Sequence, residues 1–167
     1  EARTVSITAA AMAGWTGRDA AAVEAHIHEL ALLGVKPPER TPMFYPVPAA
    51  AVTNAGVIQA DPLHSSGEVE MIAVGLEDGL WVGVGSDHTD RMIERKDVLR
   101  SKRTCPKPVA RELWALDDVL PHWDQLVIRS RIKAREEWIT YQEGTLSALL
   151  PLDRLLIAYA GKARSLP

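Results

Sequence analysis

Two apolar stretches joined by a turn constrain the fold of this chain more than any other feature. Glu68 to Gly75 and Leu80 to Gly85 are rich in residues that favour strands, and Glu77-Asp78-Gly79 lies between them. The Asp-Gly dipeptide is typical of tight hairpin turns. The sequence therefore predicts that the two stretches pair as an antiparallel hairpin.

Carboxylates lie at the open end of this expected hairpin. Glu68 and Glu70 share one face of the first strand, roughly 7 Å apart, because successive strand side chains point to opposite faces. Asp87 follows the second strand, so the hairpin could bring three carboxylates together. Buried carboxylates repel one another unless a cation joins them, which predicts a metal site. The alternative from spacing alone is a solvated strand face, with Asp87 capping a turn.

The ligand types indicate which metal to expect. A set made only of carboxylate oxygens suits a hard cation. Mg²⁺ prefers octahedral oxygen ligands and keeps waters that substrate oxygens can displace. We therefore expect Mg²⁺, with Mn²⁺ or Ca²⁺ as alternatives.

Composition limits the class of protein. The chain is 47% hydrophobic and 25% charged, which is ordinary for one soluble globular domain and predicts a single domain over residues 1–167. A net charge of −3 and short Lys/Arg clusters argue against a nucleic-acid partner. The single cysteine, Cys105, fits a reducing cytosol, and no apolar run approaches the roughly 18 residues that span a bilayer. We expect a cytoplasmic protein without a membrane partner.

The remaining segments predict a β-rich α+β protein. Ala20 to Leu33 is expected to be a helix, capped by Thr16 or Asp19 and ended by Gly34. Val5 to Ala13 is expected to be a strand or a short apolar segment, and Pro42 to Pro48 is expected to be extended. The other expectations are a short helix or turn over Arg111 to Val119, a strand pair formed by Leu126 to Ile132 with Glu137 to Gln142, and a helix over Thr145 to Ala160 despite Pro151.

One pair of residues on the expected first helix suggests acid–base chemistry. His26 and Glu29 are spaced i,i+3, so they lie on one helix face, where the carboxylate can orient the imidazole. Such a pair can activate water as a general base. The alternative is a surface helix on which both side chains are simply solvated.

These motifs, in this order, resemble the fumarylacetoacetate hydrolase superfamily and, within it, an uncharacterised bacterial branch of the DUF2848 type. Five segments carry the resemblance. They are Glu68-Val69-Glu70 as a Glu-x-Glu pair, Ser86 to Arg91 as an Asp-x-Ser/Thr-x-Arg motif, Ser101-Lys102 ahead of Cys105-Pro106, His26 to Glu29 as a His-x-x-Glu lid element, and Tyr141 to Gly144 as a late Gln-containing hairpin.

The resemblance implies a fold and a state of assembly. It implies a mixed sheet or β-roll of the fumarylacetoacetate hydrolase C-terminal-domain type, with a short N-terminal lid helix. Members of that superfamily continue with further strands, so we expect a domain that is incomplete at its C-terminus, Pro167. An incomplete sheet exposes an edge. Together with the resemblance, this edge predicts a homodimer with apolar contacts from Leu126 to Ile132 or Leu146 to Leu156.

The resemblance also implies an activity. Glu68, Glu70 and Asp87 would hold the metal, and His26 with Glu29 would be catalytic. Arg91 and Lys102 follow the acidic motif closely and could hold a substrate carboxylate or a developing enolate. The alternative for either residue is that it only neutralises the Glu/Asp cluster. The expected reaction is hydrolysis or decarboxylation of a small diketo or oxo-acid through a metal-stabilised enolate.

Alternatives to this activity remain open. Hydratase or tautomerase chemistry passes through a similar enolate, whereas a non-catalytic protein would only bind metal and organic acid. A purely structural oligomerisation domain is a third possibility. Two positions depart from the superfamily pattern, Glu94 in place of a common glutamine and Pro46 near a common lysine, and both predict an altered substrate choice.

Overall fold

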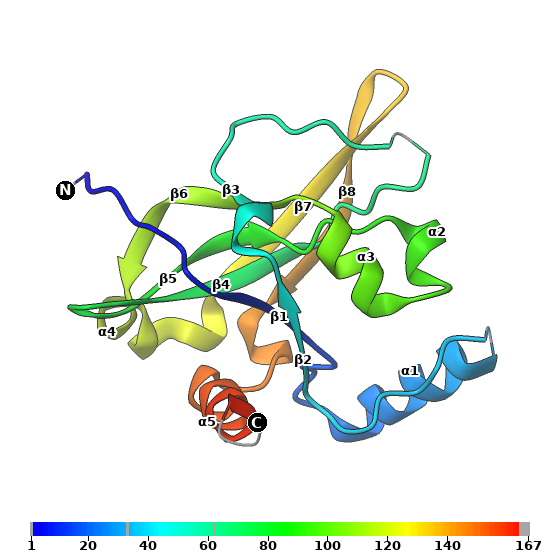
Figure 1. The fold of residues 1–167 in the computed structure, drawn as a ribbon, viewed down its shortest axis with the longest axis horizontal. Helices are drawn as coiled ribbons and strands as arrows, with labels where there is room; N and C mark the ends of the chain where they lie inside the picture. Colours follow the sequence, from blue (N-terminus) through cyan, green and yellow to red (C-terminus); the bar gives the residue numbers. More distant parts are fainter. Residues whose placement is uncertain (1, 33, 62, 164–167) are drawn as a thin grey trace.

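The computed structural model of the protein describes residues 2–32, 34–61 and 63–163 (Figure 1). Its strands are β1 (Ala10–Gly14), β2 (Met43–Val47), β3 (Val52–Thr53), β4 (Val69–Leu76), β5 (Gly79–Ser86), β6 (Lys107–Ala115), β7 (Val127–Ala134) and β8 (Glu137–Thr145). Its helices are α1 (Ala20–Leu32), α2 (Arg91–Glu94), α3 (Val98–Thr104), α4 (Leu116–Val119) and α5 (Leu152–Ala163). Short 3₁₀ helices span Ala49–Ala51, Leu120–Gln125 and Leu146–Ala148.

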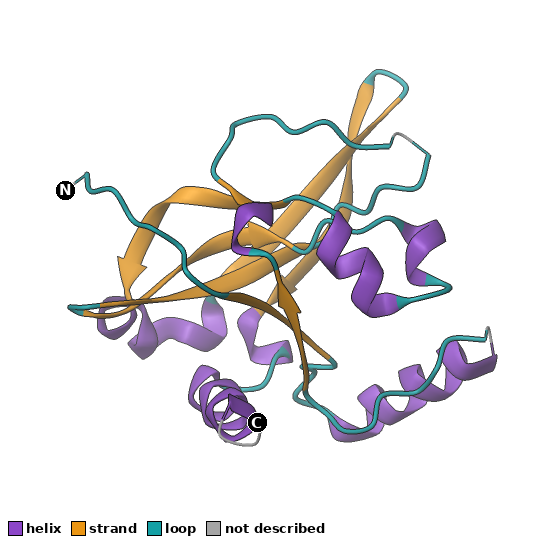
Figure 2. Cartoon of the chain, viewed as in Figure 1, coloured by secondary structure: helices purple, strands orange, loops and turns teal. Residues whose placement is uncertain are grey.

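The strands form one mixed sheet and two ribbons (Figure 2). The four-stranded sheet has the order β3-β6-β5-β4, in which β3 is parallel to β6 and the other pairs are antiparallel. β1 pairs with β2, and β7 pairs with β8, in two-stranded antiparallel ribbons. The expectation of a β-rich α+β fold with a mixed sheet is thus confirmed.

The hairpin predicted from the Asp-Gly turn is formed by β4 and β5. Its register runs from Val69 opposite Ser86 to Leu76 opposite Gly79. Glu77 and Asp78 form the turn between the strands, and Gly79 has a φ of +129° that residues with a side chain rarely adopt. This register places Glu70 opposite Gly85, next to the start of the Asp87 segment.

Helix α1 begins and ends as its sequence signals predict. Asp19 is the cap, since its Oδ1 accepts hydrogen bonds from the backbone N–H groups of Ala21 and Ala22 at 2.9 and 3.1 Å. Gly34 has a φ of +86°, the left-handed conformation typical of the position after a helix. Leu33, the predicted last residue, lies outside the described residues.

Two of the predicted helical segments were wrong in part. Residues 111–115 belong to β6 because they pair with β5, and only Leu116–Val119 is helical. The helix expected from Thr145 is broken, because proline disfavours a helical conformation in the residue before it. Leu146–Ala148 forms a 3₁₀ turn, and α5 begins at Leu152, directly after Pro151.

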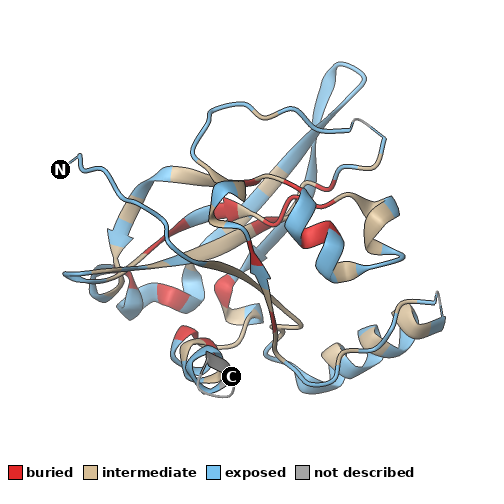
Figure 3. Cartoon of the chain, viewed as in Figure 1, coloured by how far each residue is buried: buried red, intermediate tan, exposed pale blue. Residues whose placement is uncertain are grey.

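The core lies between the four-stranded sheet and the C-terminal helices (Figure 3). Its buried residues are Val82, Val119, Trp123, Leu146 and Leu152. By contrast, no residue of α1 is buried, and this helix lies at the edge of the molecule (Figures 1 and 3). Among the residues that the structure describes, no helix has the length and apolar character needed to cross a membrane.

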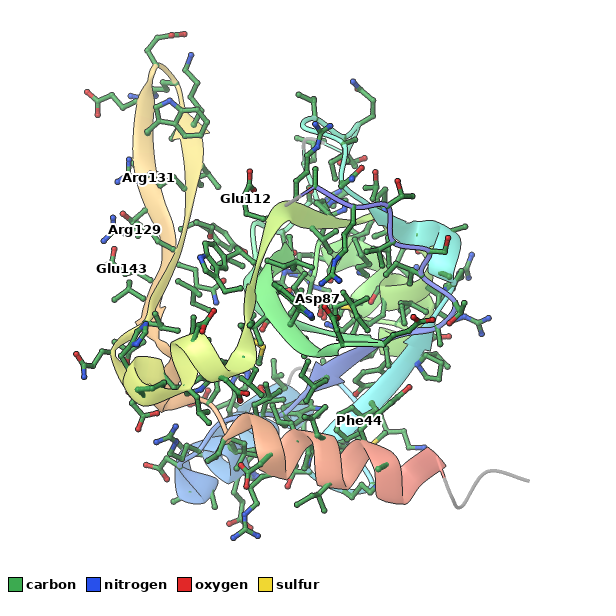
Figure 4. All side chains as sticks on the ribbon, turned by 90° about the vertical axis from the view of Figure 1, so that its left-hand side faces the viewer. Phe44, Asp87, Glu112, Arg129, Arg131 and Glu143 are labelled. Carbon is green, nitrogen blue, oxygen red and sulfur yellow. The ribbon has the colours of Figure 1, made fainter. Side chains whose placement is uncertain are left out.

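The β7–β8 ribbon confirms the late strand pair predicted from Leu126 to Ile132 and Glu137 to Gln142. The tip of this ribbon projects beyond the body of the protein, and Arg129, Arg131 and Glu143 lie along the ribbon (Figure 4). Its base is tied to β4, because the Gln142 side chain accepts from the Val69 N–H and donates to the Val69 carbonyl. The motif glutamine therefore links the ribbon to the hairpin that carries the carboxylates.

Candidate functional site

A cavity of about 1520 Å³ collects most of the residues that the sequence singled out. Its walls come from the loop before α1, α1 itself, β2, the start of β4, the segment after β5, and helices α2 and α3. The predicted site residues that line it are Glu68, Glu70, Asp87, His26, Arg91 and Lys102. Glu29 is not among the lining residues.

Strand alternation places the two glutamates on this wall. Val69, between them, is buried on the opposite face and is only 6% exposed. Ser86 Oγ donates a hydrogen bond of 2.7 Å to the Glu68 carbonyl, which fixes the end of β5 against the start of β4. Asp87 follows directly and reaches the same cavity, as the hairpin predicted.

Glu70 is the carboxylate of this group that lacks a partner. No described residue forms a hydrogen bond or ion pair with its side chain. Burial, followed by the negative charges of Asp87 and Glu68, raises the pKa of Glu70 to about 7, and Lys102 opposes this effect. The ionised form of Glu70 is therefore less stable in this cavity than in water.

Asp87 is held by two lysines. Its residue is 4% exposed, and its Oδ2 accepts a hydrogen bond from Lys102. The Lys107 ammonium lies 3.0 Å from Oδ1 but donates its hydrogen bond to the His88 carbonyl at 2.6 Å. Oδ1 thus receives a neighbouring positive charge but accepts no hydrogen bond from the described residues.

Lys102 keeps its positive charge in this buried position. Burial lowers the pKa of Lys102, but the attraction of Asp87 and the hydrogen bond to it outweigh burial, and the pKa is raised. Glu94 Oε1 lies 3.9 Å from the same ammonium group. A protonated lysine at the cavity wall can stabilise a negatively charged oxygen.

Arg91 bridges two glutamates at the rim of the site. Its guanidinium lies 2.9 Å from Glu68 Oε1 and 2.6 Å from Glu94 Oε2, and it is 3.5 Å from the hydroxyl of Tyr141. Burial lowers the pKa of Arg91. The hydrogen bonds to Tyr141, Glu94 and Glu68 and the negative charge of Glu68 outweigh burial, so the pKa is raised overall. In this arrangement Arg91 neutralises carboxylates of the chain.

The donor chemistry of the site fits a hard divalent cation. The three carboxylates of the predicted ligand set line one cavity, and a bound cation would stabilise the ionised form of Glu70, which burial and the neighbouring negative charges disfavour. In the part of the chain that the structure describes, no three Asp, Glu, His or Cys side chains form a ready-made ligand group. Arg91 and Lys102 are bonded to Glu68 and Asp87 instead, so binding a metal would require these two side chains to move.

His26 reaches the cavity, but its contact with Glu29 is loose. His26 Nδ1 lies 3.7 Å from Glu29 Oε2, which is longer than a hydrogen bond. Both side chains are more than half exposed, at 59% and 74%. The predicted dyad therefore has its residues on one helix face, as expected, without the hydrogen bond that would orient the imidazole.

His88 has a structural role beside the site. Its Nε2 lies 2.6 Å from Ser65 Oγ, and its Nδ1 lies 3.3 Å from the Pro106 carbonyl oxygen. The residue is buried and does not line the cavity. Cys105 is also buried, and it is a free thiol.

The sequence did not reveal several residues of the site. Trp15, Tyr45 and Arg95 line the cavity, and Lys107 supports Asp87 from behind it. The glycines on both sides of the Trp15–Thr16 pair were the available signal for a special backbone at this point. Lys107 has no such signal, because its sequence neighbours are two prolines and its role depends on the packing of β6.

No curated protein matches the sequence. The structure resembles the crystal structure of Cg1458, with a TM-score of 0.54 and 16% sequence identity over 68% of this chain and 50% of that chain. At this identity the likeness shows a shared fold alone, and this chain spans about half of the length of Cg1458.

A family comparison covers nearly the whole chain. The match extends over residues 13–167, from the end of β1 to the last residue. It includes every residue that lines the cavity. The chain therefore belongs to the family described as "Protein of unknown function (DUF2848)".

Proposed function

We propose that this chain belongs to a metal-dependent enzyme that breaks a C–C bond of a small diketo or oxo-acid, as a hydrolase or a lyase. The observation that carries the proposal is Glu70, a carboxylate without a partner whose pKa is raised to about 7 by burial and by Asp87 and Glu68. Grouping anions in this way costs free energy, which a bound cation would recover.

The order of five motifs supports membership of the fumarylacetoacetate hydrolase superfamily and a lid-bearing fold of its C-terminal-domain type. In that reading, Glu68, Glu70 and Asp87 would hold Mg²⁺, with Mn²⁺ or Ca²⁺ as alternatives. When bound, the ion would supply Lewis-acid stabilisation of the enolate that remains when the C–C bond breaks.

The chain's own cations suit an anionic substrate. Lys102 is kept protonated by Asp87 and can donate a hydrogen bond to a developing enolate oxygen. Arg91 has a guanidinium at the same wall, and it can bind a substrate carboxylate if Glu68 turns from it toward a metal. Glu94 remains 2.6 Å from Arg91 Nη1 and would hold the guanidinium during that exchange.

The position of His26 suits a general base. The imidazole lines the cavity and is open to water, so it can take a proton from a water molecule that attacks a substrate carbonyl. Closing the 3.7 Å gap to Glu29 Oε2 would orient the ring and stabilise its protonated form. Hydrolysis needs this water, whereas decarboxylation does not.

A second function is favoured by one specific observation. Glu68 and Asp87 are already paired with Arg91 and Lys102, and His26 is not hydrogen-bonded to Glu29. A protein that binds a metal and an organic acid without catalysis would need no more than this arrangement. Hydratase or tautomerase activity would use the same enolate and the same residues.

An assay against a panel of diketo and oxo-acids, with and without Mg²⁺, tests the proposal. We expect turnover that depends on Mg²⁺ and is lost in Glu70→Gln, while Glu136→Gln, at an exposed position, keeps it. Product identification separates water addition from loss of CO₂. Calorimetric binding of an oxo-acid without turnover, in both this chain and a C-terminally extended one, would favour the binding protein.

A further inference from the structure

Helix α1 brings His26 to the cavity, although the helix itself is poorly anchored. None of its residues is buried, and it lies at the edge of the molecule (Figure 1). Helices of this length owe most of their stability to packing against other elements. The position of His26 must therefore depend on contacts outside α1.

Trp15 supplies such a contact. The indole and imidazole rings have centroids 5.9 Å apart and planes tilted by 51°. This separation is within the range of favourable aromatic pairs. Trp15 and His26 both line the cavity, so the indole lies beside the imidazole at the site itself.

The backbone of Trp15 is held in an unusual conformation. Its φ is +60°, which is uncommon for any residue with a side chain and costly for a bulky one. Such strain persists only where the surroundings impose it, and it is concentrated at functional sites. The conformation therefore indicates that the direction of this side chain is imposed by the fold.

Tyr45 is one group that fixes the direction of the Trp15 side chain. Trp15 Nε1 donates a hydrogen bond of 3.3 Å to Tyr45 Oη on β2. A Cβ atom added at Gly14 would lie 3.0 Å from Tyr45 Cε2, so a side chain there would push the phenol ring away. Gly14 thus allows Tyr45 to pack closely enough to hold the indole.

The loop that carries Trp15 is also tied to the far end of the chain. Leu150 N–H donates to the Thr16 carbonyl at 2.7 Å, and Arg18 N–H donates to the Ala148 carbonyl at 2.9 Å. The Arg18 guanidinium adds two hydrogen bonds to Asp124, at 2.9 and 2.7 Å. Trp15 is consequently fixed to the body of the protein and not to α1.

We propose that Trp15 is a positioning residue that fixes the His26 imidazole at the cavity wall. Tyr45 and Gly14 orient the indole, and the indole in turn limits where α1 can place the imidazole. Trp15 thus acts through His26. The catalytic consequence rests on the proposed function, whereas the ring contact does not.

Proton NMR tests the contact without any assay of activity. The chain has five histidines, so the His26 ring resonance can be assigned by its loss in His26→Gln. We expect Trp15→Leu to remove the ring-current shift of that resonance, Trp15→Phe to retain part of it, and Trp138→Leu, at an exposed position of the ribbon, to leave it unchanged. An unchanged His26 resonance in folded Trp15→Leu would overturn the proposal.

Tyr45→Phe keeps the test decisive if Trp15→Leu does not fold. This variant removes only the acceptor of the Trp15 Nε1 hydrogen bond, and we expect a smaller shift in the same direction. A His26 resonance identical to that of the wild type would then contradict the proposed chain of contacts.

Kinetics test the catalytic consequence. We expect Trp15→Leu to lower kcat on the order of 10- to 100-fold with little change in KM, because a misplaced base slows the chemical step. In a His26→Gln background the same substitution should have no further effect on kcat. Additive losses would show that Trp15 acts independently of His26. If the wild type turns over no oxo-acid, the proposed function fails, and the NMR result alone decides the contact.

Discussion

The Lys107 ammonium lies 3.0 Å from Oδ1 of Asp87, and the two side chains are only 3% and 6% exposed. Lys102 binds the other oxygen of the same carboxylate from the cavity side. Asp87 is thus fixed between one lysine that faces the cavity and another that belongs to the interior. The acidic site is held in place by a residue that does not line it.

Lys107→Met should destabilise the protein. Removing one member of a buried ion pair leaves the other charge poorly compensated, which costs roughly 3 to 5 kcal/mol. Because Lys102 still binds Asp87, we expect the lower end, about 3 kcal/mol. Urea unfolding measures the change, with Lys133→Met as the matched control because the Lys133–Glu136 pair is exposed. Equal stability of the two variants would contradict the structural role of Lys107.

The titration of Glu70 should make stability depend on pH in the metal-free protein. The pKa of Glu70 is about 7 when folded, against its usual value of 4.5, so the folded protein retains a proton that the unfolded chain releases. Protonation of Glu70 therefore stabilises the folded protein in full below pH 4.5. As the pH rises through 7 this stabilisation is lost, which lowers the free energy of unfolding by up to about 3 kcal/mol. Unfolding measured with a chelator present should show this fall in the wild type and not in Glu70→Gln.

Mg²⁺ should stabilise the folded protein through the three carboxylates. A ligand that binds only the folded state raises the melting temperature, and the rise grows with the logarithm of its concentration relative to Kd. We expect Mg²⁺ to raise Tm in the wild type and to leave Glu70→Ala unchanged, since that variant lacks the carboxylate without a partner. Glu136→Ala serves as the control for loss of a surface carboxylate. A full Mg²⁺ shift in Glu70→Ala would remove Glu70 from the ligand set.

His26→Ala should reduce turnover far more than metal affinity. A general base acts on the chemical step and contributes about 10²- to 10⁴-fold. His28→Ala is the matched control, because His28 is exposed on the same helix and does not line the cavity. Steady-state kinetics, with Mg²⁺ titrated separately, separates the two effects. Wild-type turnover in His26→Ala would assign the imidazole to the solvated face of the helix.

The chain should associate as a homodimer through the β7–β8 ribbon. A two-stranded ribbon on its own is marginally stable, and this one exposes Trp138 and Ile139, which are 67% and 44% exposed. The alternative contact predicted over Leu146 to Leu156 is less suitable, because Leu146 and Leu152 are buried within the chain. Light scattering should give twice 18.3 kDa for the wild type and a lower mass for Trp138→Lys. A monomer at every accessible concentration would contradict this assembly.

The sequence by itself determined the local elements whose signals are contained in a few neighbouring residues. The Asp-Gly turn specified the β4–β5 hairpin, and strand alternation then put Glu68 and Glu70 on one face. Asp19 and Gly34 marked the ends of α1 for the same reason, since capping depends on residues within one turn of the helix.

Tertiary structure alone decided the features that join distant segments. Residues 111–115 became part of a strand because β5 offered them a partner, against their local preference. The pairing of Asp87 with Lys107, and the contacts of Trp15 with Tyr45 and His26, join residues with no signal of proximity in the sequence. The charge state of Glu70 also depends on burial and on the charges around it, which are fixed only when the chain has folded.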